Sequence, residues 1–282
     1  MIGTHVYPTA TAAWEKIIQQ LVVTVNGVAP RGEPTREILH ASVGFPMFHP
    51  VVTRINRRLN YKFMVAEALW ILSGRDDVGY LAKHSSNMLQ FSDDGVTLSG
   101  AYGPRVASQF SYVVEKLRED ESTRQAVLTT WERNPAPSKD IPCTIAITFN
   151  IRYSYLNAHV FMRSSDAWLG VPYDFFSFSC IAMGILAALN DGRESGNRIY
   201  PGVIYWTAAS SHLYDRDIAK AESCLGIGNG NYETEAIPRA FTNNMQGFKA
   251  LCDELDRIQT CAVVDRPPWI PKTFVTSASI VK

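Results

Sequence analysis

Cys143 is the residue whose type and setting most clearly suggest chemistry, since it follows Pro142 and begins a β-prone stretch. A cysteine in a folded protein is most often a small buried hydrophobe. Here, however, three arginines fall on segments predicted to be neighbouring strands: Arg124, Arg152 and Arg163. Cationic neighbours lower the pKa of a thiol and produce the thiolate, which is the reactive form. We therefore predict that Cys143 is a nucleophile.

Glu67 is a carboxylate inside an otherwise apolar helical run, residues 63–72. Its side chain either reaches the surface or is buried, and the pattern favours neither. If it is buried, desolvation raises its pKa and suits it to proton transfer near neutral pH.

Residues 161–174 and 211–214 hold further polar side chains. Arg163 and Ser164 are suited to binding a phosphate, because a guanidinium forms strong hydrogen bonds with it. Asp174 precedes a predicted helix, where the commonest role of an aspartate is the N-cap. His212 and Tyr214 are two residues apart and project from one face if their segment is extended. Whether these side chains meet depends on the elements that carry them.

Those elements are predicted from hydrophobic periodicity and turn signals. Helices are expected at residues 10–25, 61–73 (ending at Gly74) and 175–189. Strands are expected at residues 124–131, 144–152, 155–163 and 203–207, the second and third forming a hairpin. Residues 28–37 are expected to form a loop, 93–95 and 100–103 turns, and 267–271 an irregular segment. Helices mixed with antiparallel strands indicate the α+β class.

The composition restricts the class of protein. Of the 282 residues, 46% are hydrophobic, which is enough to form a core, and no linker or repeat divides the chain. Lys and Arg number 27, as do Asp and Glu, so the net charge is zero. A surface that follows nucleic-acid phosphates is normally basic, so no nucleic-acid partner is predicted, although a pocket for one phosphate is compatible with this balance.

Cysteine spacing and apolar stretches bear on metal sites and on location. The five cysteines include no Cys-x-x-Cys pair, so we expect no disulfide framework and no metal. The longest apolar stretch, residues 175–189, is shorter than the ~20 residues of a membrane span, and no secretory signal is visible at the start. A reducing cytoplasm, with no membrane partner, is the expected setting.

Five motifs in this order resemble the thymidylate synthase family: residues 67–74 (EALWILSG), 101–103 (AYG), 141–143 (IPC), 163–174 (RSSDAWLGVPYD) and 211–214 (SHLY). The resemblance covers residues 10–220 of what we predict to be a single domain, 1–282, whereas residues 221–282 match the family poorly. It implies a thymidylate synthase-like α+β fold with a mixed β-sheet covered by helices. It also implies a homodimer that pairs sheet on sheet and shares its active sites.

The resemblance assigns roles around the base of a nucleoside monophosphate. It implies that Cys143 adds to carbon 6 of the pyrimidine ring, that Glu67 and Tyr102 handle protons and ordered water, and that Asp166 lies under the base. The implied cofactor is 5,10-methylenetetrahydrofolate, bound by Asp166, Met88, Phe91 and Gly170.

Further implied roles concern the phosphate and the sugar. The phosphate would be bound by Arg163 and Ser164, by an arginine of the loop around Arg31, and by Arg124 of the partner subunit. The sugar hydroxyl would be bound by His212 and Tyr214.

Asp174 departs from the family, because the synthases have asparagine at this position. The asparagine reads uracil by donating to oxygen 4 and accepting from the ring N–H. A carboxyl group instead accepts from the amino group of cytosine and, with a proton, bonds ring nitrogen 3. A mismatched buried polar pair costs ~1–3 kcal/mol. Asp174 therefore points to a cytidylate, as in the deoxycytidylate hydroxymethylase branch of the family.

Three further departures concern water near the reacting carbon. Met88 and Phe91 stand where the synthases have tryptophans, and Thr144 replaces the histidine after the cysteine. Less aromatic cover admits water to the exocyclic methylene and gives a hydroxymethyl product. The expected function is therefore hydroxymethylation of dCMP, and CMP is a second possible substrate. Such a reaction would serve phage DNA modification, in the host cytoplasm, or nucleoside-antibiotic synthesis. The alternatives are dCMP methylation, a dUMP-using synthase or hydroxymethylase, and a non-catalytic nucleotide- or RNA-binding homologue.

Overall fold

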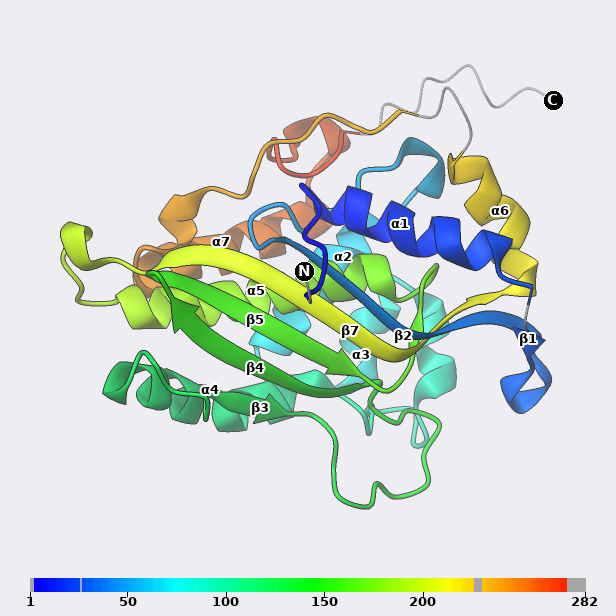
Figure 1. Ribbon diagram of the computed structural model, residues 1–282, viewed down its shortest axis with the longest axis horizontal. Coiled ribbons are helices and arrows are strands. Elements are labelled where there is room, and N and C mark those ends of the chain that lie inside the picture. Colours follow the sequence, from blue (N-terminus) through cyan, green and yellow to red (C-terminus); the bar gives the residue numbers. More distant parts are fainter. Residues whose placement is uncertain (1–2, 26, 226–229, 273–282) are drawn as a thin grey trace.

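The described residues form a mixed β-sheet of seven strands (Figure 1). The computed structural model describes residues 3–25, 27–225 and 230–272. The strands are β1 (Gly27–Val28), β2 (Thr35–Pro46), β3 (Val127–Thr129), β4 (Thr144–Arg152), β5 (Tyr155–Met162), β6 (Ser165–Asp166) and β7 (Tyr200–Tyr214). Their order is β1-β2-β7-β5-β4-β3, and β6 pairs with β7. Neighbours are antiparallel except that β5 and β6 run parallel to β7.

Helices cover the sheet. They are α1 (Ala10–Val23), α2 (Tyr61–Leu72), α3 (Val78–Ala82), α4 (Tyr102–Glu119), α5 (Val171–Asn190), α6 (Asp215–Leu225) and α7 (Met245–Thr260). Short 3-10 helices occur at Pro30–Gly32, Ile55–Arg57, Ser86–Phe91, Ser195–Asn197, Arg239–Thr242 and Val263–Asp265. Figure 1 shows β2, β7, β5 and β4 side by side in front of α5, which contacts β5 and β7 and also touches α1, α2, α4 and α7. The α+β class is confirmed.

Helix α5 is the centre of the core. Its Phe175 ring lies 4.5 Å from that of Phe45 on β2 and 5.8 Å from that of Trp206 on β7. The helix is long and apolar enough to cross a membrane by composition, but nearly all of it is buried inside the protein. Of its 20 residues, only Tyr173 and Asp174 are not fully buried. Asp174 is the one charged residue of this helix.

The other face of the sheet leaves large side chains uncovered in this chain. Phe161 and Tyr155 on β5 and Tyr200 on β7 are exposed, and Tyr155 pairs with Tyr200 across the two strands. An exposed row of aromatic groups on one sheet face is typical of a surface that another molecule covers. The sheet-on-sheet dimer itself stays a prediction.

Several predicted elements are confirmed. Helix α1 begins after the N-cap Thr9, whose side chain accepts from the amide of Ala12, and α2 begins after Asn60, which caps in the same way. Strand β4 has the predicted bounds, and the hairpin to β5 turns at Tyr153 and Ser154, with φ of 53° and 63°. The right-handed twist of a hairpin requires positive φ in such a two-residue turn.

Other predictions were wrong in their bounds. Residues 35–37 belong to β2 and not to a loop, and β7 is much longer than the predicted 203–207. The expected turn at 100–103 ends at the N-cap Ala101, and α4 begins at Tyr102. Helix α5 begins at Val171 because Pro172 fits a first helical turn and does not end the preceding loop. Of the poorly matching part 221–282, residues 226–229 and 273–282 lie outside the described residues.

Candidate active site

Cys143 lines a pocket of about 170 Å³ where the loop before β4 meets three helices. The pocket brings together residues that are distant in sequence: Glu67 from α2, Tyr102 from the start of α4, and Asp174 and Ser177 from α5. Apolar side chains form the rest of its wall: Trp70, Ile71, Leu81, Met88 and Leu98. Three of the four predicted catalytic residues, Cys143, Glu67 and Tyr102, therefore share one pocket with Asp174, whereas the fourth, Asp166, does not line it.

The loop that carries Cys143 is held by Arg163. The Arg163 guanidinium donates from Nε to the carbonyl of Pro142 at 2.9 Å and from Nη2 to that of Ile141 at 3.0 Å. The same Nη2 lies 3.8 Å from the Sγ of Cys143. Arg163 thus fixes the backbone around the thiol and places a positive charge beside it.

The pKa of the Cys143 thiol differs from the expected direction. Burial raises it above its ordinary value, the Arg163 charge lowers it only in part, and Asp174 raises it further. Of the other two arginines, Arg152 lies at the opposite end of β4, where it donates to carbonyls of residues 121 and 122, and Arg124 is exposed ahead of β3. The expectation that Arg124, Arg152 and Arg163 together lower this pKa was therefore wrong, because Arg163 alone of the three contributes and burial outweighs it.

The side chain of Glu67 is mostly withdrawn from solvent. Of its two predicted positions, at the surface or buried, the structure therefore supports the buried one. Burial and the nearby charge of Asp174 raise the pKa of Glu67 to about 8, against a smaller lowering by the Ser177 hydroxyl. A carboxyl group with this pKa exchanges its proton near neutral pH. The structure thus places a proton donor and acceptor in the same pocket as the thiol.

Asp174 is not the N-cap of α5, so this alternative to its predicted role in substrate binding is excluded. The helix begins four residues earlier than expected, with Gly170 at the cap position, and Asp174 lies inside its first turn. The side chain faces the pocket instead of the helix end. Burial and the charge of Asp166 raise the pKa of Asp174 to about 7, although a helix N-terminus by itself would lower it.

Asp166 and Gly170 form the turn that leads into α5. The Oδ1 of Asp166 accepts from the amides of Trp168 and Leu169, both at 2.8 Å, and burial raises the pKa of this carboxyl group. A side chain on Gly170 would place its Cβ 3.2 Å from the Asp166 carbonyl oxygen and 3.4 Å from the Oδ2 of Asp174. Glycine therefore allows the two aspartates to lie on either side of one tight turn.

A second cluster lies at the ends of β6 and β7. Asp166 is paired with His212 across these strands, and the Oγ of Ser164 is 3.5 Å from the Nδ1 of His212. The rings of His212 and Tyr214 meet edge to face at 5.3 Å, as expected for two residues on one face of a strand. Burial lowers the pKa of His212, and so does the positive charge of Arg31.

Arg31 connects the two clusters by its charge, since it lowers the pKa of Cys143 as well as that of His212. It has a φ of 56° within the Pro30–Gly32 turn. Arg124 belongs to neither of these two clusters in its own chain. Met88 lines the pocket, whereas Phe91 is 42% exposed and is not among the lining residues.

Two pocket residues were missed by the sequence analysis, Asp140 and Ser177. Ser177 is three residues after Asp174, so both project from one face of a helix. Asp140 is three residues before Cys143 in the same loop. In both cases the signal was a polar residue at short spacing from a residue already singled out.

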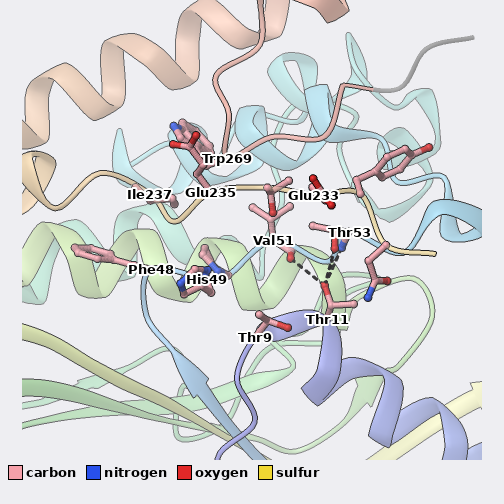
Figure 2. A pocket seen from close by; sticks show the side chains of 14 residues that line it. Thr9, Thr11, Phe48, His49, Val51, Thr53, Glu233, Glu235, Ile237 and Trp269 are labelled. Atoms are coloured by element: carbon pink, nitrogen blue, oxygen red, sulfur yellow. Dashed lines mark hydrogen bonds between the residues drawn. The ribbon is translucent and has the colours of Figure 1, made fainter.

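A second cavity, of about 300 Å³, lies away from these residues and is drawn in Figure 2. Thr11 there donates to the carbonyl of Val51 at 3.3 Å and accepts from the amide of Thr53 at 2.9 Å. His49, Glu233, Glu235 and Trp269 also line it. Its lining holds neither a cysteine nor any residue predicted for the site, so the Cys143 pocket is the candidate active site.

Residues 14–245 match the family model described as thymidylate synthase. The chain belongs to the thymidylate synthase family. The resemblance drawn from five motifs is thus confirmed at the family level.

Among curated relatives, the chain is 32% identical over 254 residues to the deoxyuridylate hydroxymethyltransferase of Bacillus phage SP01. That match covers 81% of this chain and 63% of the relative, so the chain spans less than two thirds of the relative's length. The name of this relative does not support the cytidylate branch specifically.

Proposed function

We propose that this protein transfers a one-carbon unit to carbon 5 of deoxycytidylate and releases 5-hydroxymethyl-deoxycytidylate. The observation that carries the proposal is the position of Asp174, whose carboxyl group faces the pocket of Cys143 and is free of any capping role. A base bound over Cys143 would present its 4-position and ring nitrogen 3 to this carboxyl group.

Cytosine suits a carboxyl group that is partly protonated. With a pKa of about 7, Asp174 holds a proton in a large fraction of molecules near neutral pH. The protonated form donates to ring nitrogen 3, while its other oxygen accepts from the amino group. Donation to nitrogen 3 also withdraws electrons from the ring, which favours addition at carbon 6.

The thiol of Cys143 acts as the nucleophile once it loses its proton. Its Sγ forms a bond to carbon 6, and the electron pair moves onto carbon 5, which becomes nucleophilic. Arg163, at 3.8 Å, stabilises the thiolate before the attack. Glu67, with a pKa of about 8, is suited to moving protons to and from the base and the bound water.

The pocket wall fits a reduced folate. Apolar groups from α2 and from residues 81–98 border the thiol, which suits a flat ring stacked beside the base: Trp70, Ile71, Leu81, Met88 and Leu98. 5,10-Methylenetetrahydrofolate bound there would supply a one-carbon unit at the oxidation level of formaldehyde. Met88 is the member of the predicted folate set that this wall contains.

The phosphate needs more positive charge than one chain brings to the site. Arg163 already donates to two carbonyl groups, and Arg31 is the other arginine whose charge reaches Cys143. A homodimer that pairs the exposed sheet faces would add Arg124 of the partner subunit, and we include this dimer in the proposal.

Deoxyuridylate is the second candidate substrate, and the named phage relative favours it. Protonated Asp174 can donate to oxygen 4 of uracil and accept from the ring N–H, so uracil is accommodated when the carboxyl group is neutral. The ionised form would instead face oxygen 4 with a negative charge. Methylation of dCMP is the other reaction to be tested.

A product assay tests these alternatives directly. The protein is incubated with methylenetetrahydrofolate and dCMP, CMP or dUMP, and the nucleotide is analysed by mass spectrometry. We expect dCMP to gain one CH₂O unit while tetrahydrofolate is released. A gain of CH₂ with release of dihydrofolate would mean methylation, and a product from dUMP alone would overturn the cytidylate assignment.

A further inference from the structure

Asp140 is a third carboxyl group in the pocket of Cys143, after Glu67 and Asp174. It lies three residues before the nucleophile in the same loop. Its Oδ2 accepts a hydrogen bond from the amide of Gly100 at 2.8 Å. Among the described residues, Oδ1 has no hydrogen-bond donor.

The position of this carboxyl group is tightly defined. A side chain on Gly100 would place its Cβ 2.9 Å from the carbonyl oxygen of Asp140 and 3.0 Å from its Oδ1. The loop that carries the thiol is thus packed against the turn that leads to Tyr102. A carboxyl group held by one oxygen, with the other unpaired beside a reactive centre, is suited to binding a water molecule.

Asp140 is also distinct from the other two carboxyl groups in its surroundings. Glu67 and Asp174 lie on α2 and α5, whereas Asp140 lies in the loop that carries Cys143, and its charge, like that of Asp174, raises the pKa of the thiol. Burial raises the pKa of Asp140, while the amide of Gly100 and the charge of Arg105 lower it in part. Arg105 is bound elsewhere, to Glu132 and to the carbonyl of Ala101.

We propose that Asp140 holds and deprotonates the water that captures the exocyclic methylene on carbon 5, a role that rests on the proposed hydroxymethylation. The water oxygen forms a bond to the exocyclic carbon, and the electron pair of the exocyclic double bond moves into the ring. The proton that the water loses passes to the Asp140 carboxylate. The bond between carbon 6 and the Cys143 sulfur then breaks, which restores the ring double bond and the thiolate.

This water step can be tested without folate, because it is reversible. 5-Hydroxymethyl-dCMP is incubated with the protein in ¹⁸O-labelled water. Cys143 adds to carbon 6, hydroxide leaves with a proton from Asp140, and labelled water is captured in its place. The incorporation of ¹⁸O into the hydroxymethyl group is measured by mass spectrometry.

The informative variant is Asp140→Asn, whose amide oxygen can still accept from Gly100 and keep the loop in place. We expect it to slow the exchange by about 100-fold, the usual contribution of a general base. The matched control is Asp93→Asn. Asp93 holds the same loop, accepting from the Ser138 hydroxyl at 2.5 Å and the Lys139 amide at 3.2 Å, but it does not line the pocket.

The outcomes separate this inference from the proposed function. If the wild-type protein exchanges oxygen and Asp140→Asn does so at a similar rate, the role of Asp140 is overturned while hydroxymethylation stands. Equal slowing by Asp93→Asn would also overturn it, since loop position would then explain the effect. If the wild-type protein exchanges oxygen with neither 5-hydroxymethyl-dCMP nor its uracil counterpart, the proposed function falls, and this role with it.

Alkylation of Cys143 by iodoacetamide, with no ligand present, gives an independent readout. Because the Asp140 charge raises the pKa of the thiol, Asp140→Asn should shift the pH profile of alkylation to lower pH. A shifted profile also shows that the variant is folded around Cys143. An unchanged profile would mean that this carboxyl group does not face the thiol, which would overturn the inference.

Discussion

The hydroxyl group of Tyr102 accepts two hydrogen bonds from Thr144, one from the amide at 3.2 Å and one from the Oγ1 at 2.9 Å. A phenol oxygen has two acceptor positions and one proton. With both acceptor positions used, the Tyr102 proton is left to donate into the pocket. Thr144, which directly follows Cys143 at the start of β4, thereby sets the direction of a donor at the start of α4.

Replacement of Thr144 by Val should therefore impair catalysis without removing any group that touches the substrate. Loss of one neutral hydrogen bond of ~1–1.5 kcal/mol lowers kcat/KM by about 10-fold. Thr144→Ser, which keeps the hydroxyl group, is the matched control and should retain most activity. In the Tyr102→Phe background, Thr144→Val should have little further effect, and additive losses would show that the two residues act separately.

Glu67 links the site to stability. Its pKa is about 8 in the folded protein, against an ordinary value of 4.5. The folded state therefore holds the proton more tightly, so this stabilisation is complete below about pH 4.5 and is lost as the pH rises through 8. The free energy of unfolding of the wild type therefore falls as the pH rises. In Glu67→Gln this fall should be smaller by about 1–3 kcal/mol.

Urea denaturation at several pH values measures this effect. The control is Glu222→Gln, which changes an exposed glutamate on α6. The curve of unfolding free energy against pH should be flatter for Glu67→Gln than for either the wild type or the control. Parallel curves for all three proteins would mean that Glu67 is not desolvated.

The sequence predicted best those elements whose signal is local. Strand β4 alternates apolar and polar residues from Ile147 to Arg152, and its bounds were predicted correctly. Helix α5 was predicted to begin at residue 175, because the polar side chain of Asp174 interrupts the apolar run that defines the rest. The placement of Asp174 in the pocket depends on the packing of α5 against α2, which no local pattern contains.

The direction of the Cys143 pKa was unpredictable for a related reason. Arg152 ends β4 and Arg163 directly follows β5, so only Arg163 lies at the end of the hairpin where β4 begins. Burial then outweighs the charges of Arg163 and Arg31, because desolvation disfavours the charged thiolate. Asp140 was missed since a polar residue in a loop normally faces solvent.

Cys143→Ser should abolish turnover and leave nucleotide binding nearly intact. Serine keeps the size of the side chain but is far less acidic, so no covalent bond to carbon 6 forms at a useful rate. Release of tritium from carbon 5 of the labelled nucleotide is the direct measurement and should vanish. Release at the wild-type rate would remove Cys143 from the mechanism.

Arg124 should act in the site of the partner subunit. It is exposed ahead of β3 and remote from Cys143 in its own chain. We expect Arg124→Ala and Cys143→Ser homodimers each to be inactive or weak. Mixed dimers should recover activity, because one of their two sites has both residues intact. Native mass spectrometry verifies that the subunits have exchanged. If they have exchanged and activity does not recover, this result counts against shared sites.

The choice of base is tested by Asp174→Asn. Because α5 begins at Val171, Asp174 is not its N-cap. A substitution without effect could therefore not be explained by asparagine capping the helix in place of aspartate. Asparagine can turn its amide to donate to oxygen 4 of uracil and accept from the ring N–H. With cytosine, the amide cannot donate to ring nitrogen 3 and at the same time offer its oxygen to the amino group. We therefore expect the ratio of kcat/KM for dCMP to that for dUMP to fall by about 10- to 150-fold, the effect of one mismatched hydrogen bond of ~1.5–3 kcal/mol. Both substrates must be measured on both proteins, because a fall with dCMP alone would also follow from a loss of folded protein. A ratio that stays constant would mean that Asp174 does not read the base, and the substrate would then be the uracil nucleotide of the phage relative.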